Sequence, residues 1–266
     1  MDLHTIPIKS EFFTQRDSTL VTWLGMAGAM INARGAILLI DPLLSAWEED
    51  GRLRSETGYW LSVPPPVYAQ DIPRADVVMY THADEDHVGK ETARTLAKLT
   101  GVLFLAPPPV IEVLIEAGIT PEQCITARDW EIHKFGEAEI TITPALHDWQ
   151  EVNPWQRGDC CGYLVQTKNG KVWHPGDTRL IDDLLTVKDV DVLFFDVASV
   201  PSHLGPQGSA QIARSSGAKT LIAYHYGTFD LPPGSFANCN PLEALPYVEG
   251  LNAELQILNP GDVIRV

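Results

Sequence analysis

Residues 80–89 have the sequence Tyr80-Thr81-His82-Ala83-Asp84-Glu85-Asp86-His87-Val88-Gly89. Four side chains of metal-ligating type fall within six positions of this stretch, and they are His82, Asp84, Asp86 and His87. An apolar run at 77–79 precedes them and predicts a buried strand, while a helical pattern follows at 90–99. The cluster is therefore predicted on the turn between a strand end and a helix start.

The chemistry of this cluster favours a metal ion. Side chains alternate between two faces of an extended segment, so His82, Asp84 and Asp86 are expected to point to the same side. His87 then turns inward as the chain enters the helix. Imidazoles and carboxylates this close together suit zinc or a harder divalent ion. The alternative is a polar loop whose carboxylates cap a helix, but the density of ligand types is high for a plain turn.

The overall composition is that of a globular protein with a sizeable core, since 45% of the residues are hydrophobic. No apolar run approaches the length of a transmembrane helix. Residues 1–5 lack a basic segment followed by an apolar one, so we expect no secretory signal. None of the four cysteines forms a C-x-x-C pair, so we expect reduced thiols and a cytoplasmic protein.

The charge of the chain limits its partners. A formal net charge of -16 argues against a general surface for nucleic acid or anionic membrane, because both need clustered Lys and Arg. A small-molecule substrate, including an anionic one met by a local positive site, stays compatible with this charge. The sequence leaves open whether the chain forms a homo-oligomer.

Strands and helices alternate through the middle of the sequence, which predicts a sheet covered by helices. Strands are predicted at 19–25, 27–32, 36–42, 77–79, 102–107, 124–125, 130–135, 139–143, 162–167, 172–174, 190–195, 219–224, 254–258 and 262–266. Helices are predicted at 90–99, 109–117, 178–185, 208–216 and 242–251. Residues 43–74, with a triple proline at 64–66, are predicted to be irregular. We find no long linker or repeat, and we predict one domain over residues 1–266.

A His or Asp repeatedly stands where an apolar strand ends. These residues are His82, His147, Asp177, Asp196 and His225. Loops at strand ends are where α/β folds place their sites. If these ends share one edge, they and the neighbouring Asp86 and His87 are enough to hold two metal ions.

These motifs, in this order, resemble the metallo-β-lactamase superfamily of metal-dependent hydrolases. Its signature is H-x-H-x-D-H followed by a distant His, an Asp and a final His. Here the corresponding residues are His82-x-Asp84-x-Asp86-His87, His147, Asp177 and His225, and the similarity covers about residues 19–228. More narrowly, the sequence is similar to the L-ascorbate-6-phosphate lactonase-like branch. The stretches that carry this are Trp23-Leu24-Gly25-x-Ala27-Gly28, Ile40-Asp41-Pro42-Leu43-Leu44-Ser45, Pro64-Pro65-Pro66, His174-Pro175-Gly176-Asp177-Thr178 and His225-Tyr226-Gly227-Thr228-Phe229.

The resemblance implies a four-layer αββα sandwich with two divalent metal ions, zinc or manganese or also iron, at one edge of the sheets. It assigns the first metal to His82, Asp84 and His147. It assigns the second metal to Asp86, His87 and His225, with Asp177 as the bridge between the two ions. The sequence departs from the family at Asp84, where the usual residue is His. A carboxylate there makes the first site harder and favours manganese or iron beside zinc, or else marks a weakened site.

The resemblance also implies a mechanism, in which a metal-bound hydroxide attacks the substrate and Asp86 orients it and passes on a proton. The expected substrate is a lactone or a phosphorylated sugar-acid lactone. The alternatives are a phosphodiesterase of the same fold and a non-catalytic binding protein with a decayed metal site. Candidate substrate contacts are His203, Arg157 and Trp149, each weighed against an ordinary loop position. His174 is expected to be packed or to support a ligand.

Overall fold

The computed structural model describes residues 3–266, so the first two residues of the predicted 1–266 domain lie outside this range. Two seven-stranded sheets form the centre of the molecule. In spatial order the first sheet contains β16 (Val263–Arg265), β1 (Thr19–Gly25), β2 (Gly28–Ala33), β3 (Ala36–Ile40), β6 (Val77–Met79), β7 (Leu103–Ala106) and β8 (Cys124–Thr126). The second contains β15 (Glu254–Gln256), β14 (Thr220–Tyr224), β13 (Val192–Asp196), β12 (Lys171–His174), β11 (Cys161–Gln166), β10 (Ala138–Pro144) and β9 (Ile132–Phe135).

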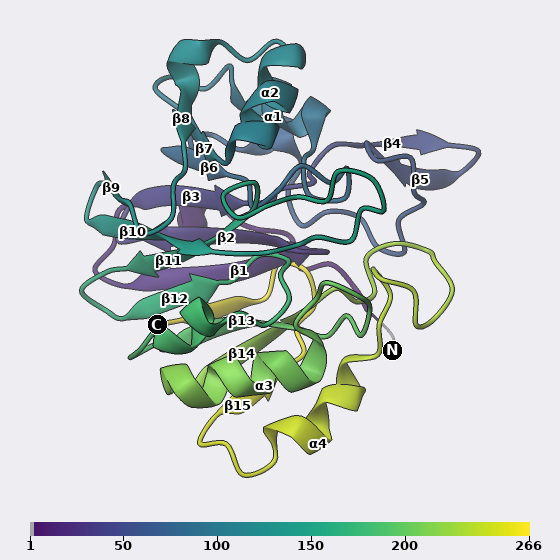
Figure 1. The fold of residues 1–266 in the computed structure, drawn as a ribbon. Helices are drawn as coiled ribbons and strands as arrows, with labels where there is room; N and C mark the ends of the chain where they lie inside the picture. Colours follow the sequence, from purple (N-terminus) through teal and green to yellow (C-terminus); the bar gives the residue numbers. More distant parts are fainter. Residues whose placement is uncertain (1–2) are drawn as a thin grey trace.

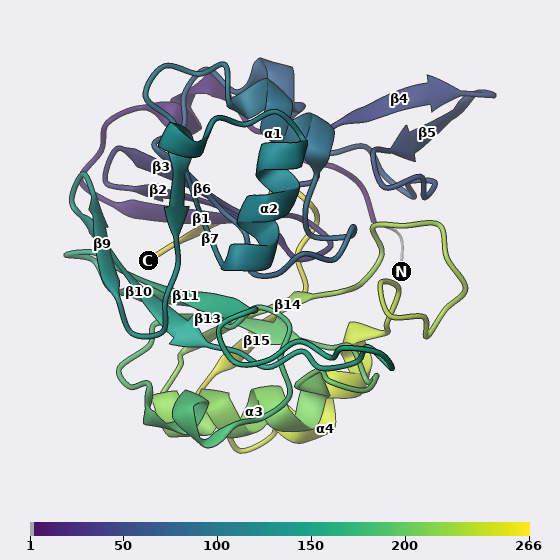
Figure 2. The same ribbon diagram turned by 45° about the horizontal axis from the view of Figure 1, so that its top comes forward.

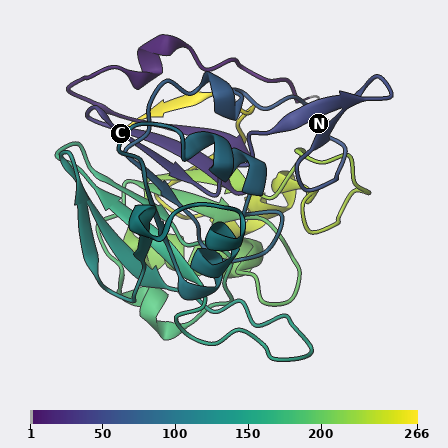
Figure 3. The same ribbon diagram turned by 90° about the horizontal axis from the view of Figure 1, so that it is seen from above.

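Each sheet has an antiparallel half and a parallel half. Strands β16, β1, β2 and β3 pair antiparallel, and β3, β6, β7 and β8 pair parallel. In the second sheet β9 to β12 pair antiparallel and β12 to β15 pair parallel. The C-terminal strand β16 lies beside the N-terminal β1, which Figure 3 shows as yellow next to purple.

Helices cover the outer faces of the two sheets. Figures 1 and 2 show α1 (Lys90–Leu96) and α2 (Pro108–Glu116) on one outer face, with α3 (Gly205–Ser216) and α4 (Leu245–Val248) on the other. This confirms the predicted four-layer αββα sandwich. Short 3-10 helices lie at Ser10–Phe13, Ala69–Asp71, Pro121–Gln123, Asp182–Thr186 and Pro241–Ala244. None of the helices described over residues 3–266 combines the length and the apolar content needed to cross a membrane.

The core follows the two-residue period of the strands. In β3, Leu38 and Ile40 face the core between the sheets, whereas Ile37 and Leu39 pack in the cluster that includes α1 and α2. All five residues of β3 are buried, which explains the unbroken apolar sequence of this strand. The core between the sheets draws on both of them, since Trp23 of β1 and Tyr163 of β11 belong to the same cluster.

Three predictions differ from the structure by more than the ends of an element. The segment 43–74 is not wholly irregular, because it contains a two-stranded hairpin of β4 (Ala46–Glu49) and β5 (Arg52–Ser55), which projects from the body in Figures 1 and 2. The helix predicted at 242–251 is only a 3-10 turn followed by the four residues of α4.

The helix predicted at 178–185 was wrong over its first half. Thr178 does not cap a helix: its hydroxyl accepts a hydrogen bond from the amide of Leu146 (2.8 Å), and the amide of Arg179 donates to the carbonyl of Leu146 (2.9 Å). The hydroxyl of Thr178 thus accepts from a distant segment and donates to the carbonyl of Arg179 (2.8 Å), whereas an N-cap hydroxyl accepts from an amide two or three positions further along its own chain. A 3-10 helix begins only at Asp182. The two bonds to Leu146 hold Asp177 next to the segment that carries His147.

Candidate metal centre

The strand ends predicted to carry ligands meet at one edge of the sandwich. His82 follows β6, His147 follows β10, Asp177 follows β12 and His225 follows β14. Oδ2 of Asp177 lies 3.1 Å from Nε2 of His87, and Oδ1 lies 3.3 Å from Nε2 of His225. Residues up to 143 positions apart in the chain therefore surround one carboxylate.

Two of the three groups of ligand types within residues 3–266 share Asp177. One contains His82, His147 and Asp177, and the other contains His87, Asp177 and His225, with the donor atoms of each group within 4.8 Å of one another. All five side chains are buried. This is the spacing that lets several donor atoms contact one ion.

The two remaining carboxylates each approach one group. Oδ2 of Asp84 lies 3.4 Å from Nε2 of His82 and 3.3 Å from Nε2 of His147. Oδ2 of Asp86 lies 3.8 Å from Nε2 of His87. Asp84 thus stands beside the same two imidazoles with which the resemblance grouped it.

A buried carboxylate, Asp41, orients the histidines of the central motif. Nδ1 of His87 donates to Oδ2 of Asp41 (2.8 Å). The hydroxyl of Thr81 also donates to Asp41 (2.6 Å) and so accepts a hydrogen bond from Nδ1 of His82 (2.9 Å). Because Nδ1 carries the proton in both rings, the lone pair of each Nε2 faces the centre.

Three further histidines are oriented by hydrogen bonds from Nδ1. Nδ1 of His225 donates to Oδ1 of Asp196 (2.8 Å), and Nδ1 of His203 donates to Oδ2 of the same carboxylate (3.1 Å). Nδ1 of His147 donates to the carbonyl of Ser202 (2.9 Å). Asp196 therefore supports two imidazoles, one with each of its oxygens.

Backbone conformation at the site is strained where these contacts require it. Asp41, Ser202 and His225 all have positive φ angles, of 43°, 64° and 69°. Such conformations cost about 1–3 kcal/mol each in a non-glycine residue and cluster at functional sites. Gly176 meets the same demand without a side chain, since its φ is 67° and an added Cβ would lie 2.5 Å from the carbonyl oxygen of Cys161.

The electrostatics keep the shared carboxylate ionised. Burial alone would raise the pKa of Asp177, but the imidazoles of His225 and His87 hold it well below its ordinary value. Burial would lower the pKa of His87, but the carboxylates of Asp177 and Asp41 outweigh this and raise it well above its ordinary value. A metal ion at Nε2 of His87 would therefore displace a proton from this ring, and the ionised Asp177 would pair with the bound cation.

Unpaired donor atoms at the centre fit a metal ion. Within residues 3–266, buried side-chain atoms without a hydrogen-bond partner include Nε2 of His82, His87 and His225 and Oδ1 of Asp177. Leaving one such atom unsatisfied costs about 1–3 kcal/mol. Four of them converge here, and their chemistry is that of ligands to zinc, manganese or iron.

Comparison with known families agrees with this chemistry. The model of the beta-lactamase superfamily domain matches residues 37–226, which include all of the strand ends above. The chain belongs to this superfamily. It is a metal-dependent hydrolase, since relatives that align with it over almost their whole length carry that name.

One such relative is a UPF0173 metal-dependent hydrolase of Pyrobaculum aerophilum, which is 30% identical over 92% of this chain and 99% of its own length. Among solved structures, a metallo hydrolase of Ignicoccus hospitalis is 19% identical with a TM-score of 0.67, over 94% of this chain and 98% of that one. An isothiocyanate hydrolase from Delia radicum gut bacteria is 16% identical with a TM-score of 0.69, over 92% and 98%. At these identities the two structures establish only the fold of this hydrolase.

A cavity of about 610 Å³ opens beside the two groups of ligand types. Its lining residues are Tyr59, Asp84, Glu85, Asp86, His147, Trp149, Asp177, Val200, Pro201, His203 and Phe236. His203 places Nε2 3.5 Å from Oδ2 of Asp177, and Nε1 of Trp149 donates to Oδ2 of Asp84 (3.0 Å). Two of the three predicted substrate contacts of the hydrolase thus line this cavity.

Arg157 does not line this cavity. Its guanidinium pairs with Asp129 (2.7 Å) and with both oxygens of Asp183 (2.9 and 3.0 Å), beside a separate hollow. The expectation that Arg157 meets a phosphate or carboxylate of the substrate is therefore corrected. A guanidinium with two carboxylate partners contributes to local structure instead.

Two further residues complete the comparison with the sequence. His174 is packed: its Nε2 donates to the carbonyl of Ala27 (2.8 Å), Nδ1 accepts from the amide of Gly176, and burial lowers its pKa to about 4.

Sequence reasoning missed the support that Asp41 gives to His87, although Asp41 also stands where an apolar strand ends. The rule that flagged the other strand ends would have found it.

Proposed function

We propose that this hydrolase holds two divalent metal ions in adjacent sites and opens a lactone ring by cleaving its C–O bond. The observation that carries the proposal is the pair of ligand groups that share Asp177 and expose unpaired Nε2 atoms. The resemblance to the L-ascorbate-6-phosphate lactonase-like branch motivates the choice of a lactone, either neutral or phosphorylated.

The residue roles follow the two groups. We assign the first site to His82, Asp84 and His147. We assign the second site to Asp86, His87 and His225, with Asp177 shared between the two. Zinc or manganese suits these mixed imidazole and carboxylate sets, and iron is a further candidate. The 3.3–3.4 Å contacts of Asp84 support a working first site over a decayed one.

Divalent ions at such a site lower the pKa of bound water and polarise the carbonyl oxygen of a substrate. The side chains supply the rest. The carboxylate of Asp86 takes the proton of the attacking water. The water oxygen bonds to the lactone carbonyl carbon, and the ring C–O bond breaks with its electron pair on the ring oxygen. Asp86 then returns the proton to that oxygen, and the product is a hydroxy acid.

His203 and Trp149 are proposed to bind the substrate. The hydrogen bond from Nδ1 of His203 to Asp196 fixes the ring, so that Nε2 faces the cavity beside Asp177. Trp149 presents its half-exposed indole to the same cavity.

Phosphodiester hydrolysis is the second candidate function. It is favoured by the sharing of Asp177, because two ions about 3.5–4 Å apart can stabilise both the attacking and the leaving oxygen of an in-line displacement at phosphorus.

We also propose that residues 1–266 form one domain in a cytoplasmic protein. The core cluster that draws on both sheets supports a single domain. The four cysteines are free thiols, two of them buried, which supports a reducing compartment.

The decisive experiment measures metal content by elemental analysis in the native protein, in Asp84→Ala and in the neighbouring control Glu85→Gln. We expect about two ions per chain in the native protein and the control, and about one in Asp84→Ala. Hydrolysis is then measured with lactones and with bis-p-nitrophenyl phosphate. Cleavage of the phosphodiester without cleavage of lactones selects the second candidate, and activity that survives removal of His147 or His225 contradicts both.

A further inference from the structure

The helix that follows the central motif begins without a cap from its own side chains. Helix α1 starts at Lys90, and the residue in the N-cap position is Gly89, which has no side chain to accept a hydrogen bond. The first amides of a helix have no partner within it, and Ser, Thr, Asp or Asn at the N-cap usually supplies one. The partner of these amides must therefore come from another part of the chain.

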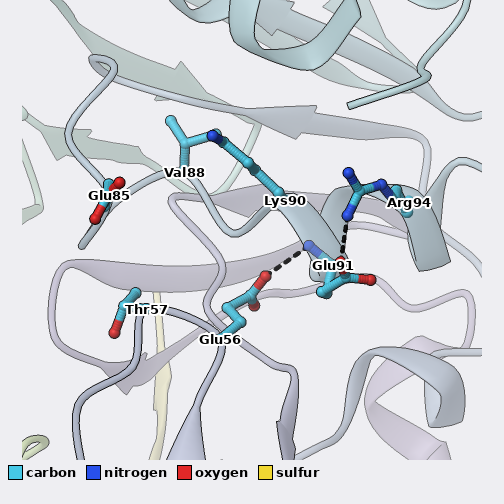
Figure 4. A pocket seen from close by; sticks show the side chains of 7 residues that line it. All are labelled: Glu56, Thr57, Glu85, Val88, Lys90, Glu91 and Arg94. Carbon is cyan, nitrogen blue, oxygen red and sulfur yellow. Dashed lines mark hydrogen bonds and ion pairs between the residues drawn. The ribbon is translucent and has the colours of Figure 1, made fainter. Parts of the chain in front are cut away.

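Glu56 supplies this cap from the β4–β5 hairpin segment. Its Oε2 accepts hydrogen bonds from the amides of Glu91 (2.8 Å) and Thr92 (3.0 Å), and its Oε1 accepts one from the hydroxyl of Thr92. Figure 4 shows Glu56 beside the start of α1, with its bond to Glu91. A Cβ added to Gly89 would lie 2.6 Å from Oε1 of Glu56. Glu56 thus occupies the place that the side chain of a local cap would take.

The same carboxylate also holds the segment that follows β3. The amide of Ser45 donates to Oε1 of Glu56 (3.3 Å), and the amide of Glu56 donates to the carbonyl of Ser45 (3.1 Å). The amide of Leu44 donates to the hydroxyl of the buried Thr92 (2.9 Å). Glu56 and Thr92 therefore join residues 44–45 to the first turn of α1.

The two joined segments carry His87 and the carboxylate that orients it. Asp41 lies three positions before Leu44, and His87 lies five positions before Thr92. Nδ1 of His87 donates to Oδ2 of Asp41 across the gap between the segments (2.8 Å). A shift of α1 away from residues 44–45 would lengthen this bond. It would also turn Nε2 of His87 and move the adjacent Asp86.

The histidines of the first ligand group are positioned by other contacts. His82 follows β6 directly, and its Nδ1 donates to Thr81, whose amide and hydroxyl both donate to Asp41 (2.8 and 2.6 Å). His147 comes from the second sheet and is oriented by the carbonyl of Ser202. The sheets therefore hold these two imidazoles independently of the start of α1.

Helix capping alone does not account for a carboxylate at this place. Burial raises the pKa of Glu56, although the hydrogen bonds from Thr92, Ser45 and Glu91 act in the opposite direction. Removing a carboxylate from water opposes folding. A serine at position 89 would cap α1 with less desolvation, but it would leave residues 44–45 unattached.

From these contacts, and resting on the two metal sites of the proposed function, we propose that Glu56 is a positioning residue for the second site. It holds His87 and Asp86 in place by fixing the start of α1 against residues 44–45. It acts only through these segments, since it is not among the residues that line the substrate cavity.

The test compares the native protein with Glu56→Ala and with the double variant Glu56→Ala/Gly89→Ser. Truncation at 56 makes room for a serine at 89, where φ is -73° and suits any residue, so that α1 regains a local cap but not its bond to Ser45. Chelator competition measures metal affinity, and thermal unfolding of the metal-free protein measures stability. We expect Glu56→Ala to weaken the second site about tenfold. The double variant should recover stability but not affinity.

Two backgrounds assign the effect to a site. His147→Ala removes a ligand of the first site and His225→Ala removes one of the second. Glu56→Ala should therefore weaken the ion that remains in the first background about tenfold, and the ion that remains in the second less than about twofold. Glu91→Gln is the matched control, because it removes a carboxylate from the same hollow but keeps the amide that donates to Glu56. It should change neither affinity.

The outcomes separate this inference from the proposed function. An unchanged second site, equal losses at both sites, or recovery of affinity together with stability in the double variant overturns the inference, because Glu56 would then be only a helix cap. A native protein that holds a single ion overturns the two-site proposal alone. The inference is then judged on that ion, and a loss of affinity that Gly89→Ser does not restore still supports it.

Discussion

The two ligand groups that meet at Asp177 are supported by different chemistry. In the second group both histidines donate from Nδ1 to a buried carboxylate, His87 to Asp41 and His225 to Asp196. Both carboxylates are fully or almost fully buried and follow or end inner strands of the sheets. A carboxylate partner makes the imidazole a stronger ligand and fixes its direction.

The first group relies on neutral partners and on loops. His82 donates to the hydroxyl of Thr81, and His147 donates to the backbone carbonyl of Ser202. Its carboxylate, Asp84, is partly exposed and accepts its hydrogen bond from the half-exposed Trp149.

The difference indicates an unequal pair of sites. We expect the second site to bind its ion more tightly, because its ligands are more basic, more buried and better fixed. The first site should exchange its ion more readily, and it opens on the cavity that receives the substrate. The substitutions below test this inequality.

The largest effect is expected from Asp177→Asn, since Asp177 belongs to both groups. We expect loss of both ions and a fall in kcat of about a thousandfold, because bound cations contribute several kcal/mol to transition-state stabilisation. Elemental analysis and hydrolysis assays measure both. The exposed Asp189→Asn is the matched control, and retention of two ions by Asp177→Asn would disprove the shared role.

The next largest effect is expected when the hydrogen-bond partners of Nδ1 of His87 and His82 are removed. Asp41→Asn should lower metal affinity about 10–100-fold, the range found for such outer partners. Thr81→Val should lower it less, because it removes a neutral partner from His82 and one donor to Asp41 but leaves the carboxylate beside His87. Competition with a chromogenic chelator gives both affinities, and thermal unfolding shows whether each variant is folded. Equal losses in the two variants would contradict the proposed inequality.

Asp84→His tests the chemistry of the first site, because it changes the type of ligand without removing a ligand. We expect two ions per chain, with the preference of the weaker site shifted towards zinc by roughly tenfold, since imidazole is a softer ligand than carboxylate. Titration with zinc and manganese in turn measures the shift. A sharp rise in metal content and activity would instead identify the natural site as degenerate.

The smallest effect is expected from Trp149→Phe, which keeps an aromatic ring but removes the hydrogen bond to Asp84. The affinity of the first site for its ion should fall about threefold to tenfold. This effect is small for the loss of a hydrogen bond to a charged group, because Trp149 and Asp84 are both partly exposed. Chelator competition measures it, with the exposed Trp130→Phe as control. A loss at the second site instead would show that the two sites are not independent.

Local patterns in the sequence were enough for most of the fold. The apolar strands before His82, Asp177 and His225 were predicted within one or two residues, because a buried strand needs an unbroken apolar run and a ligand can stand only where that run ends. The helix predicted at 178–185 failed because contacts distant in the sequence decide the structure there. There the hydrogen bonds of Thr178 and Arg179 to Leu146, 32 and 33 positions away, override the local helical pattern.

The sequence by itself determined which residue types are available as ligands and that the strand ends carry them, since both depend on neighbours within a few positions. Only the tertiary structure decided which nitrogen of each histidine faces the centre, that Arg157 pairs with Asp129 and Asp183 away from the cavity, and that the cavity is lined by acids and aromatic rings. These features depend on contacts between segments far apart in the chain. Local spacing carries no information about such contacts, because they arise only when the two sheets pack against each other.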